Sequence, residues 1–239
     1  RGIGAIDIGC GGGSQTIALA EKIGVGGSVL GVDISGPLLE CARERTILTK
    51  FKRAHVEFLK ADASTYGFTP ESVDLLFSRF GVMFFDDPVA AFKNMRPSLK
   101  ADGSLNFVCW TEIMQNEFII DGAEIITKHT QVNLPPVTRE PGPFALSEKS
   151  YVEEILTASG FKNIKIDTVH TTISTKDSLQ KAANILMNIG PRAKMLSRTD
   201  VSDETMLQIK SEIEELCKSR QIGNEITHKA CLNYVSAVR

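Results

Sequence analysis

The sequence predicts an α/β fold with a mostly parallel sheet and helices on both of its faces. Strand-like and helical segments alternate along the first half of the chain, a glycine-rich turn joins the first strand to the first helix, and aspartates stand at the ends of successive strands. Alternation of this kind sets strands side by side in parallel, because each helix carries the chain back to the start of a new strand. Ligands of such sheets bind at the carboxyl ends of the strands.

The first half of the chain is expected to supply five strands, over residues 3–8, 28–33, 55–60, 73–78 and 104–110. Helices are expected over residues 37–50 and 88–99, and each opens with a proline, which a helix tolerates in its first turn. These lengths are typical of doubly wound βα units, so the carboxyl ends of all five strands should lie along one edge.

The pattern changes after Trp110. Helices are expected over 116–131, 148–158, 176–188 and 203–220, a proline-rich loop over 135–143, and strands over 161–170 and 224–238. We interpret residues 1–239 as a single domain whose ligand-binding core is residues 1–111. Residues 112–150 and 171–224 are then helical insertions that form a lid, since insertions near strand ends commonly shape a pocket.

Composition narrows the classes of function. The chain has 239 residues, a formal net charge of -2 and a pI near 6.1, so no overall basic footprint for nucleic acid is present. The five cysteines form no C-x-x-C pair and the four histidines are scattered, so neither a metal site nor a disulfide is expected. No apolar run approaches the roughly 18 residues of a membrane span, and no signal-like segment opens the chain. We therefore expect a cytoplasmic protein with a small-molecule partner.

The glycine-rich turn spans residues 9–13, between the apolar strand that contains Asp7 and an apolar helix. Backbone without Cβ atoms lets a ligand approach closely, and the helix start presents free N–H groups to it. A dinucleotide-binding turn would need Gly or Ala at position 14, where this chain has Ser14. The Asp7 carboxylate would repel a pyrophosphate and attract an ammonium group. The motif therefore points away from NAD.

Two further acids follow the next strands. Asp33 ends the second strand about twenty residues beyond the turn, where a carboxylate can accept both hydroxyls of a ribose. Asp62 follows the third strand and can accept from the amino group of adenine, with the N–H of Ala63 facing a ring nitrogen. Each acid alone has an ordinary alternative, since Asp33 could cap the next helix and Asp62 could close a turn. Three acids at three successive strand ends favour a binding site.

With these residues the chain resembles the class I S-adenosylmethionine-dependent methyltransferases, in particular the type 11, ubiquinone-biosynthesis-like branch that acts on small molecules. The resemblance is strong from Ile3 to Trp110 and continues more loosely through Pro141–Leu146 and Ala158–Phe161. It departs from the family pattern at Ala101-Asp102-Gly103, where the family usually has Pro-Gly-Gly. The family fold implies a Rossmann-like, seven-stranded sheet in the order 3-2-1-4-5-7-6 with an antiparallel last strand.

The resemblance also implies roles for individual residues in binding S-adenosylmethionine. Asp7 would reach the amino group of the methionine portion, and Asp33 would hold the ribose. Ile34 and Leu38 would face the adenine, whose edge Asp62 and Ala63 would read. The methionine portion would lie on Gly9, Cys10, Gly11 and Gly13, with the backbone of Ser78 and Arg79 near the sulfonium and Met83 as an apolar wall.

Methyl transfer from a sulfonium is an in-line displacement, for which positioning of the acceptor and exclusion of water can suffice. No catalytic residue is therefore assigned; His129 is a weak candidate base, more readily explained as a solvated helix residue. Phe80 and Trp110 are candidate acceptor contacts, whereas core packing is favoured for Phe84 and Phe85. Two alternatives to a methyltransferase stay open: an NAD(P)-dependent oxidoreductase, and a non-catalytic protein that binds S-adenosylmethionine.

Overall fold

The computed structural model describes residues 2–49 and 52–239. The contacts divide the chain into two compact units. Unit 1 consists of Arg1–Trp110, Arg139–Asp167 and Asn233–Arg239, and unit 2 of Thr111–Thr138 and Thr168–Leu232. The predicted cofactor-binding residues all belong to unit 1.

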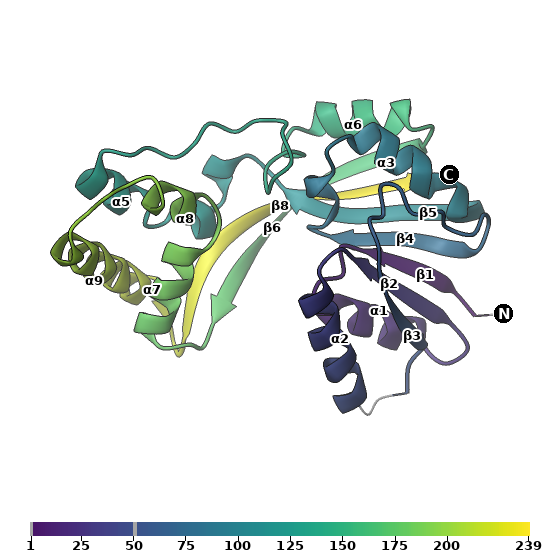
Figure 1. Ribbon diagram of the computed structural model, residues 1–239, viewed down its shortest axis with the longest axis horizontal. Helices are drawn as coiled ribbons and strands as arrows, with labels where there is room; N and C mark the ends of the chain where they lie inside the picture. The colour runs from purple at the N-terminus through teal and green to yellow at the C-terminus, as the bar shows by residue number, and fades with distance from the viewer. Residues whose placement is uncertain (1, 50–51) are drawn as a thin grey trace. The chain divides into compact units, whose positions relative to one another are not determined.

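The sheet follows the strand order β3-β2-β1-β4-β5-β8-β6 (Figure 1). The strands are β1 (Gly4–Ile8), β2 (Ser28–Asp33), β3 (His55–Lys60), β4 (Val73–Arg79), β5 (Leu99–Trp110), β6 (Lys162–Thr175) and β8 (Glu225–Val238). The pairs β1–β2, β2–β3, β1–β4 and β4–β5 are parallel. The α/β fold class and the predicted strand order are thus confirmed.

The last strand runs antiparallel to its neighbour β5. The Thr111 N–H donates to the Cys231 carbonyl at 3.3 Å, and the Arg239 N–H donates to the Gly103 carbonyl at 3.1 Å. Partner numbers in β8 therefore rise as those in β5 fall, which is the antiparallel pattern. A two-residue strand, β7 (Gln221–Ile222), pairs with the start of β8 and brings the strands in the described part of the chain to eight.

Side chains alternate between the two faces of the sheet. On one face, Ala5 and Val29 pack with Ala20 of α1 (Ser14–Ile23). On the other face, Ile6 and Val32 belong to the large core. That core also holds the apolar sides of α3 (Pro88–Met95) and α6 (Lys149–Ala158), which lie together beside β5 in Figure 1. This period of two is what a strand buried on both faces requires.

Unit 2 has its own apolar core. It is built from α5 (Ala123–Thr130), α7 (Leu179–Asn188), α8 (Gly190–Leu196) and α9 (Asp203–Ser219), preceded by the short helix α4 (Glu117–Ile120). Beneath these helices, buried Asp121 accepts hydrogen bonds from Arg220 Nη2 (Oδ1, 2.8 Å) and Arg220 Nε (Oδ2, 2.9 Å), and its Oδ2 lies 2.8 Å from His228 Nδ1. None of the helices in the described part of the chain has the length and hydrophobicity of a membrane-spanning segment.

Several predicted boundaries move for local reasons. The helix expected over 88–99 ends at Met95 and passes into a 3₁₀ turn over Arg96–Ser98, because Pro97 cannot continue the hydrogen-bond ladder. The helix expected over 116–131 is two helices, separated where Gly122 adopts a positive φ of 84°. Helix α8 was not predicted, and β6 runs on to Thr175 instead of ending at 170. The helix expected over 37–50 is α2 (Gly36–Leu48); residue 50 lies outside the described residues.

Candidate functional site

The glycine turn at the end of β1 is a tight structure that only glycine permits. Gly9, Gly11 and Gly13 have positive φ values of 68°, 52° and 74°. A Cβ at Gly13 would lie 2.7 Å from the Cβ of Ala42 on α2, so a side chain there would push α2 away. The N–H groups of Gly9 and Cys10 donate to the Val32 carbonyl at 2.8 and 3.1 Å. The turn therefore stays fastened to β2.

The end of β4 comes equally close to this turn. A Cβ on Gly81 would lie 2.5 Å from the Ile8 carbonyl oxygen. The buried Ser78 hydroxyl donates to the Ile8 carbonyl at 2.8 Å and accepts from the Gly81 N–H at 3.2 Å. Phe80, between them, adopts a positive φ of 64°, which is uncommon for a side chain of this size. Ser78 thus joins the ends of β1 and β4.

Asp33 ties the glycine turn to the end of β2. Its Oδ2 accepts from the Gly11 N–H and its Oδ1 from the Ser35 N–H, each at 2.8 Å. The alternative that Asp33 caps the following helix does not apply, because Ser35 is the N-cap of α2 and accepts from Leu38 N–H.

Asp62 stands in a turn after β3. Its Oδ1 accepts from the N–H and the hydroxyl of Ser64, at 2.8 and 2.6 Å, so the turn-closing interpretation holds for one oxygen. The side chain is exposed, whereas the neighbouring Ala63 is buried. A turn role and a ligand role are compatible, since each carboxylate oxygen carries its own lone pairs.

A cavity of about 440 Å³ opens at this edge of unit 1. It brings together eight of the predicted site residues: Gly9, Gly11, Asp33, Ile34, Leu38, Asp62, Ala63 and Phe80. Ile34 and Leu38 are 71% and 45% exposed although both are apolar. Exposed apolar side chains that line a cavity are suited to packing against a flat ring of a ligand.

A second, smaller cavity of about 200 Å³ lies on the other side of the glycine turn. Predicted residues Asp7, Cys10 and Arg79 line it, and it shares Gly9 and Gly11 with the larger cavity. Its lining is polar. The two cavities flank one stretch of backbone, so a single elongated ligand can contact both.

Asp7 is the buried charge of the smaller cavity. Its Oδ2 accepts from the Thr16 hydroxyl at 2.6 Å. Burial raises the pKa of Asp7 from 3.8 to about 6, against the opposing effects of Thr16 and Arg79. Burial also raises the pKa of Cys10 to about 12, so this thiol stays protonated and is a poor nucleophile.

Other predicted residues lie close to the cavities without lining them. Met83 is buried in the core of unit 1, and its carbonyl accepts from the Gly142 N–H at 3.0 Å. Trp110 stacks on Phe80 with ring centroids 4.6 Å apart and planes 12° apart. Ser78 is buried in the junction described above.

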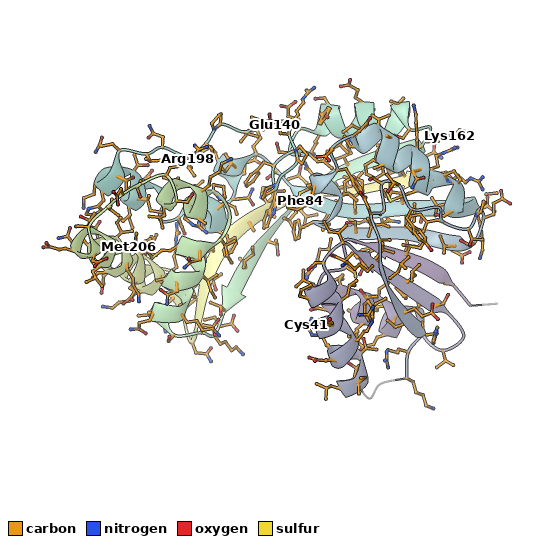
Figure 2. All side chains as sticks on the ribbon, viewed as in Figure 1. Cys41, Phe84, Glu140, Lys162, Arg198 and Met206 are labelled. Carbon is orange, nitrogen blue, oxygen red and sulfur yellow. The ribbon has the colours of Figure 1, made fainter. Side chains whose placement is uncertain are left out.

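The structure adds cavity residues that the sequence did not single out or assigned elsewhere. Phe84 lines the larger cavity and is 55% exposed, so its expected core packing is wrong. Phe85 both lines the cavity and packs edge-on against Phe92. Asp86 also lines the cavity, and its position just before α3 carries no motif that marks it. The labelled Phe84 can be followed on unit 1 in Figure 2.

The candidate base His129 belongs to unit 2. Its Nε2 lies 2.8 Å from Glu212 Oε1, which also accepts from Lys128 at 3.0 Å. No group of three potential metal ligands occurs among the residues that the structure describes.

The sequence matches to known proteins cover less than half of this chain. Residues 6–107 match the family model of a methyltransferase domain. The aklanonic acid methyltransferase of Streptomyces sp. strain C5 is 34% identical over 102 residues, which are 43% of this chain and 46% of that protein. The demethylmenaquinone methyltransferase of Staphylococcus aureus strain MRSA252 is 34% identical over 103 residues, 43% of this chain and 41% of that protein. The matched stretch is therefore less than half of each relative.

Among solved structures, phosphoethanolamine N-methyltransferase 2 of Haemonchus contortus has the same fold. It superposes with a TM-score of 0.57 and 22% identity, covering 100% of this chain and 49% of that one. The strand order, the glycine turn and the sequence match all indicate the same fold. Residues 6–107 thus resemble a methyltransferase domain in sequence, and the described part of the chain shares the fold of a solved methyltransferase structure.

Proposed function

We propose that the protein transfers a methyl group from S-adenosylmethionine to a small-molecule acceptor. The observation that carries this proposal is the pair of cavities on either side of the glycine turn. The larger has apolar walls and aspartates at the ends of two strands, which suit an adenosine. The smaller is polar and contains a buried carboxylate, which suits an amino-acid group. A pyrophosphate is disfavoured there by Asp7.

The residues fit the cofactor in their chemistry. Asp33 has one N–H donor on each oxygen and keeps lone pairs for two ribose hydroxyls. Asp62 has an oxygen for an exocyclic amine, and Ile34, Leu38 and Phe84 can sandwich a purine. S-adenosylmethionine, when bound, supplies an electrophilic methyl group on a sulfonium.

The contribution of the protein is then binding, orientation and exclusion of water. Displacement at the methyl carbon neutralises the sulfonium, so water that stabilises the initial charge slows the step. The Phe80–Trp110 stack can shield this region, and holding an acceptor in line can contribute roughly 7–11 kcal/mol in favourable cases. No group of the chain needs to accept a proton unless the acceptor arrives protonated.

The acceptor class is supported by the names of relatives. Two matched relatives are named for aklanonic acid and demethylmenaquinone, both small molecules. The net charge of -2 supports a partner other than nucleic acid. We also propose a cytoplasmic location, as expected from the sequence. That residues 112–150 and 171–224 shape the acceptor pocket is part of the same proposal.

Calorimetric titration with S-adenosylmethionine, followed by an acceptor panel, tests the proposal. We expect binding that Asp33→Asn weakens at least tenfold, with Asp102→Asn as the matched control because Asp102 is exposed at the opposite end of unit 1. Folded wild-type protein that does not bind S-adenosylmethionine would refute the proposal. Binding of NADH in its place would favour an oxidoreductase, and tight binding without turnover on any acceptor would favour a non-catalytic cofactor-binding protein.

A further inference from the structure

The smaller cavity contains two groups of opposite charge. Asp7 is buried at its base, and the exposed Arg79, the last residue of β4, lines it with Gly12, Ser14 and Gln15. Arg79 is close enough to lower the pKa of Asp7 by its charge, although the side-chain hydrogen bond to Asp7 comes from Thr16 and not from Arg79. A carboxylate-bearing and a guanidinium-bearing residue thus line the same space of about 200 Å³.

Arg79 is an unpaired cation among the residues that the structure describes. Its guanidinium forms no side-chain hydrogen bond or ion pair with the part of the chain that the structure describes. The other nearby arginine, Arg45 of α2, is engaged: its Nη1 donates to the Gly12 carbonyl and the Ser14 hydroxyl. A guanidinium offers five donors in a planar fork that matches a carboxylate.

The start of α1 adds donors of the same sign. Its N-cap, Gly13, has no side chain to cap the helix, so the first N–H groups of α1 are free of a side-chain acceptor. These groups and Arg79 favour a negative ligand group, whereas Asp7 favours a positive one in the same cavity. An α-amino acid in its zwitterionic form has both groups on one carbon.

We propose that Arg79 binds the α-carboxylate of the amino-acid portion of the cofactor and thereby selects a ligand with this group intact. The inference rests on the proposed function and assigns to Arg79 a side-chain role in place of a backbone contact. Asp7 holds the ammonium of the same zwitterion. Ligands with the adenosine portion alone use only the larger cavity and do not depend on Arg79.

The test uses calorimetry on the full chain to compare the affinities of two ligands that are both thioethers of adenosine. S-adenosylhomocysteine keeps the amino-acid group, whereas 5′-methylthioadenosine lacks it. We expect Arg79→Gln to weaken S-adenosylhomocysteine about 10- to 100-fold, the size of one lost charge-assisted contact, and to leave 5′-methylthioadenosine unchanged. Arg79→Lys should bind S-adenosylhomocysteine with intermediate affinity, because it keeps the charge and loses the fork.

The exposed Arg198 is the matched control, because Arg198→Gln makes the same change at a residue that lines neither cavity. Its affinities should equal those of the wild type. The inference is overturned if Arg79→Gln binds S-adenosylhomocysteine as the wild type does, or if it loses the same factor for both ligands. A rise in acceptor KM with unchanged S-adenosylhomocysteine affinity would assign Arg79 to the acceptor and overturn it as well. Failure of the wild type to bind S-adenosylhomocysteine would instead refute the proposed function.

Discussion

Asp7→Asn should stabilise the ligand-free protein at neutral pH and weaken its binding of the cofactor. Asp7 is 1% exposed, and burial raises its pKa from 3.8 to about 6. An ionised carboxylate in this place is therefore unfavourable in the folded state. Asparagine has nearly the same shape and keeps an oxygen for the Thr16 hydroxyl, which now donates to Asp7 at 2.6 Å.

The magnitude follows from linkage. Below pH 3.8 the carboxyl is protonated in both states and contributes nothing. As the pH rises toward about 6, the unfolded chain loses its proton and the folded chain does not, so stability falls through this window. Above pH 6 the full difference remains, which at 1.36 kcal/mol per pKa unit is about 3 kcal/mol.

Urea denaturation of wild type and Asp7→Asn at pH 4 and pH 7.5 measures this difference. We expect similar stability at pH 4 and an Asp7→Asn protein more stable by about 3 kcal/mol at pH 7.5, with S-adenosylmethionine affinity reduced at least tenfold. Asp102→Asn, a change of an exposed acid, should show no such pH dependence. A stability difference that is the same at both pH values would refute the reasoning.

Three further predictions concern the junction of strand ends and the second unit. Gly81→Ala should destabilise the folded protein by about 1–3 kcal/mol and weaken S-adenosylhomocysteine binding, because the new Cβ would lie 2.5 Å from the Ile8 carbonyl oxygen. Thermal melts and titrations measure both effects. The control is Gly67→Ala, whose Cβ would have nothing within 4 Å. Emission of Trp110, the one tryptophan, should change on S-adenosylhomocysteine binding through its stack on Phe80; an unchanged spectrum at saturation, or a full response in Phe80→Leu, would contradict this. Asp121→Asn should lower the free energy of unfolding in urea by about 3 kcal/mol, because Arg220 and His228 lose the anion that they share. These partners hold the pKa of Asp121 below 3.8, so the difference from wild type should shrink only in strong acid. A difference that already shrinks near neutral pH would contradict this prediction.

The sheet was predictable because its signals are local. The strands over 28–33 and 55–60 have the predicted bounds, and the glycine turn and proline-started helices use backbone properties that a few residues encode. Asp33, Asp62 and Ile34 reach one cavity because parallel strands end at one edge. Topology alone therefore brings together residues that are distant in sequence.

The remaining differences depend on information that a local pattern lacks. Phe84 has the sequence context of a core residue, and only the 3₁₀ turn over Val82–Phe84 exposes it while burying Met83. The break at Gly122 coincides with a Cβ position 3.3 Å from Ile213, a contact with α9 across ninety residues of sequence. Neither the direction of a side chain in an irregular turn nor a distant packing partner is visible in periodicity.

The acidic side chains of the site repel one another, and hydrogen bonds within the protein offset only part of this repulsion. The larger cavity is lined by Asp33, Asp62 and Asp86 without a cation, and Asp33 also raises the pKa of Asp7. Backbone N–H groups of Gly11, Ser35 and Ser64 offset part of this charge, and each carboxylate still has lone pairs left over. Hydroxyls, an exocyclic amine and an ammonium are all donors, so a ligand with this set relieves the repulsion that the free protein retains. A ligand rich in acceptors, such as a dinucleotide, would increase it, so we expect the site to bind the donor-rich ligand in preference to a dinucleotide.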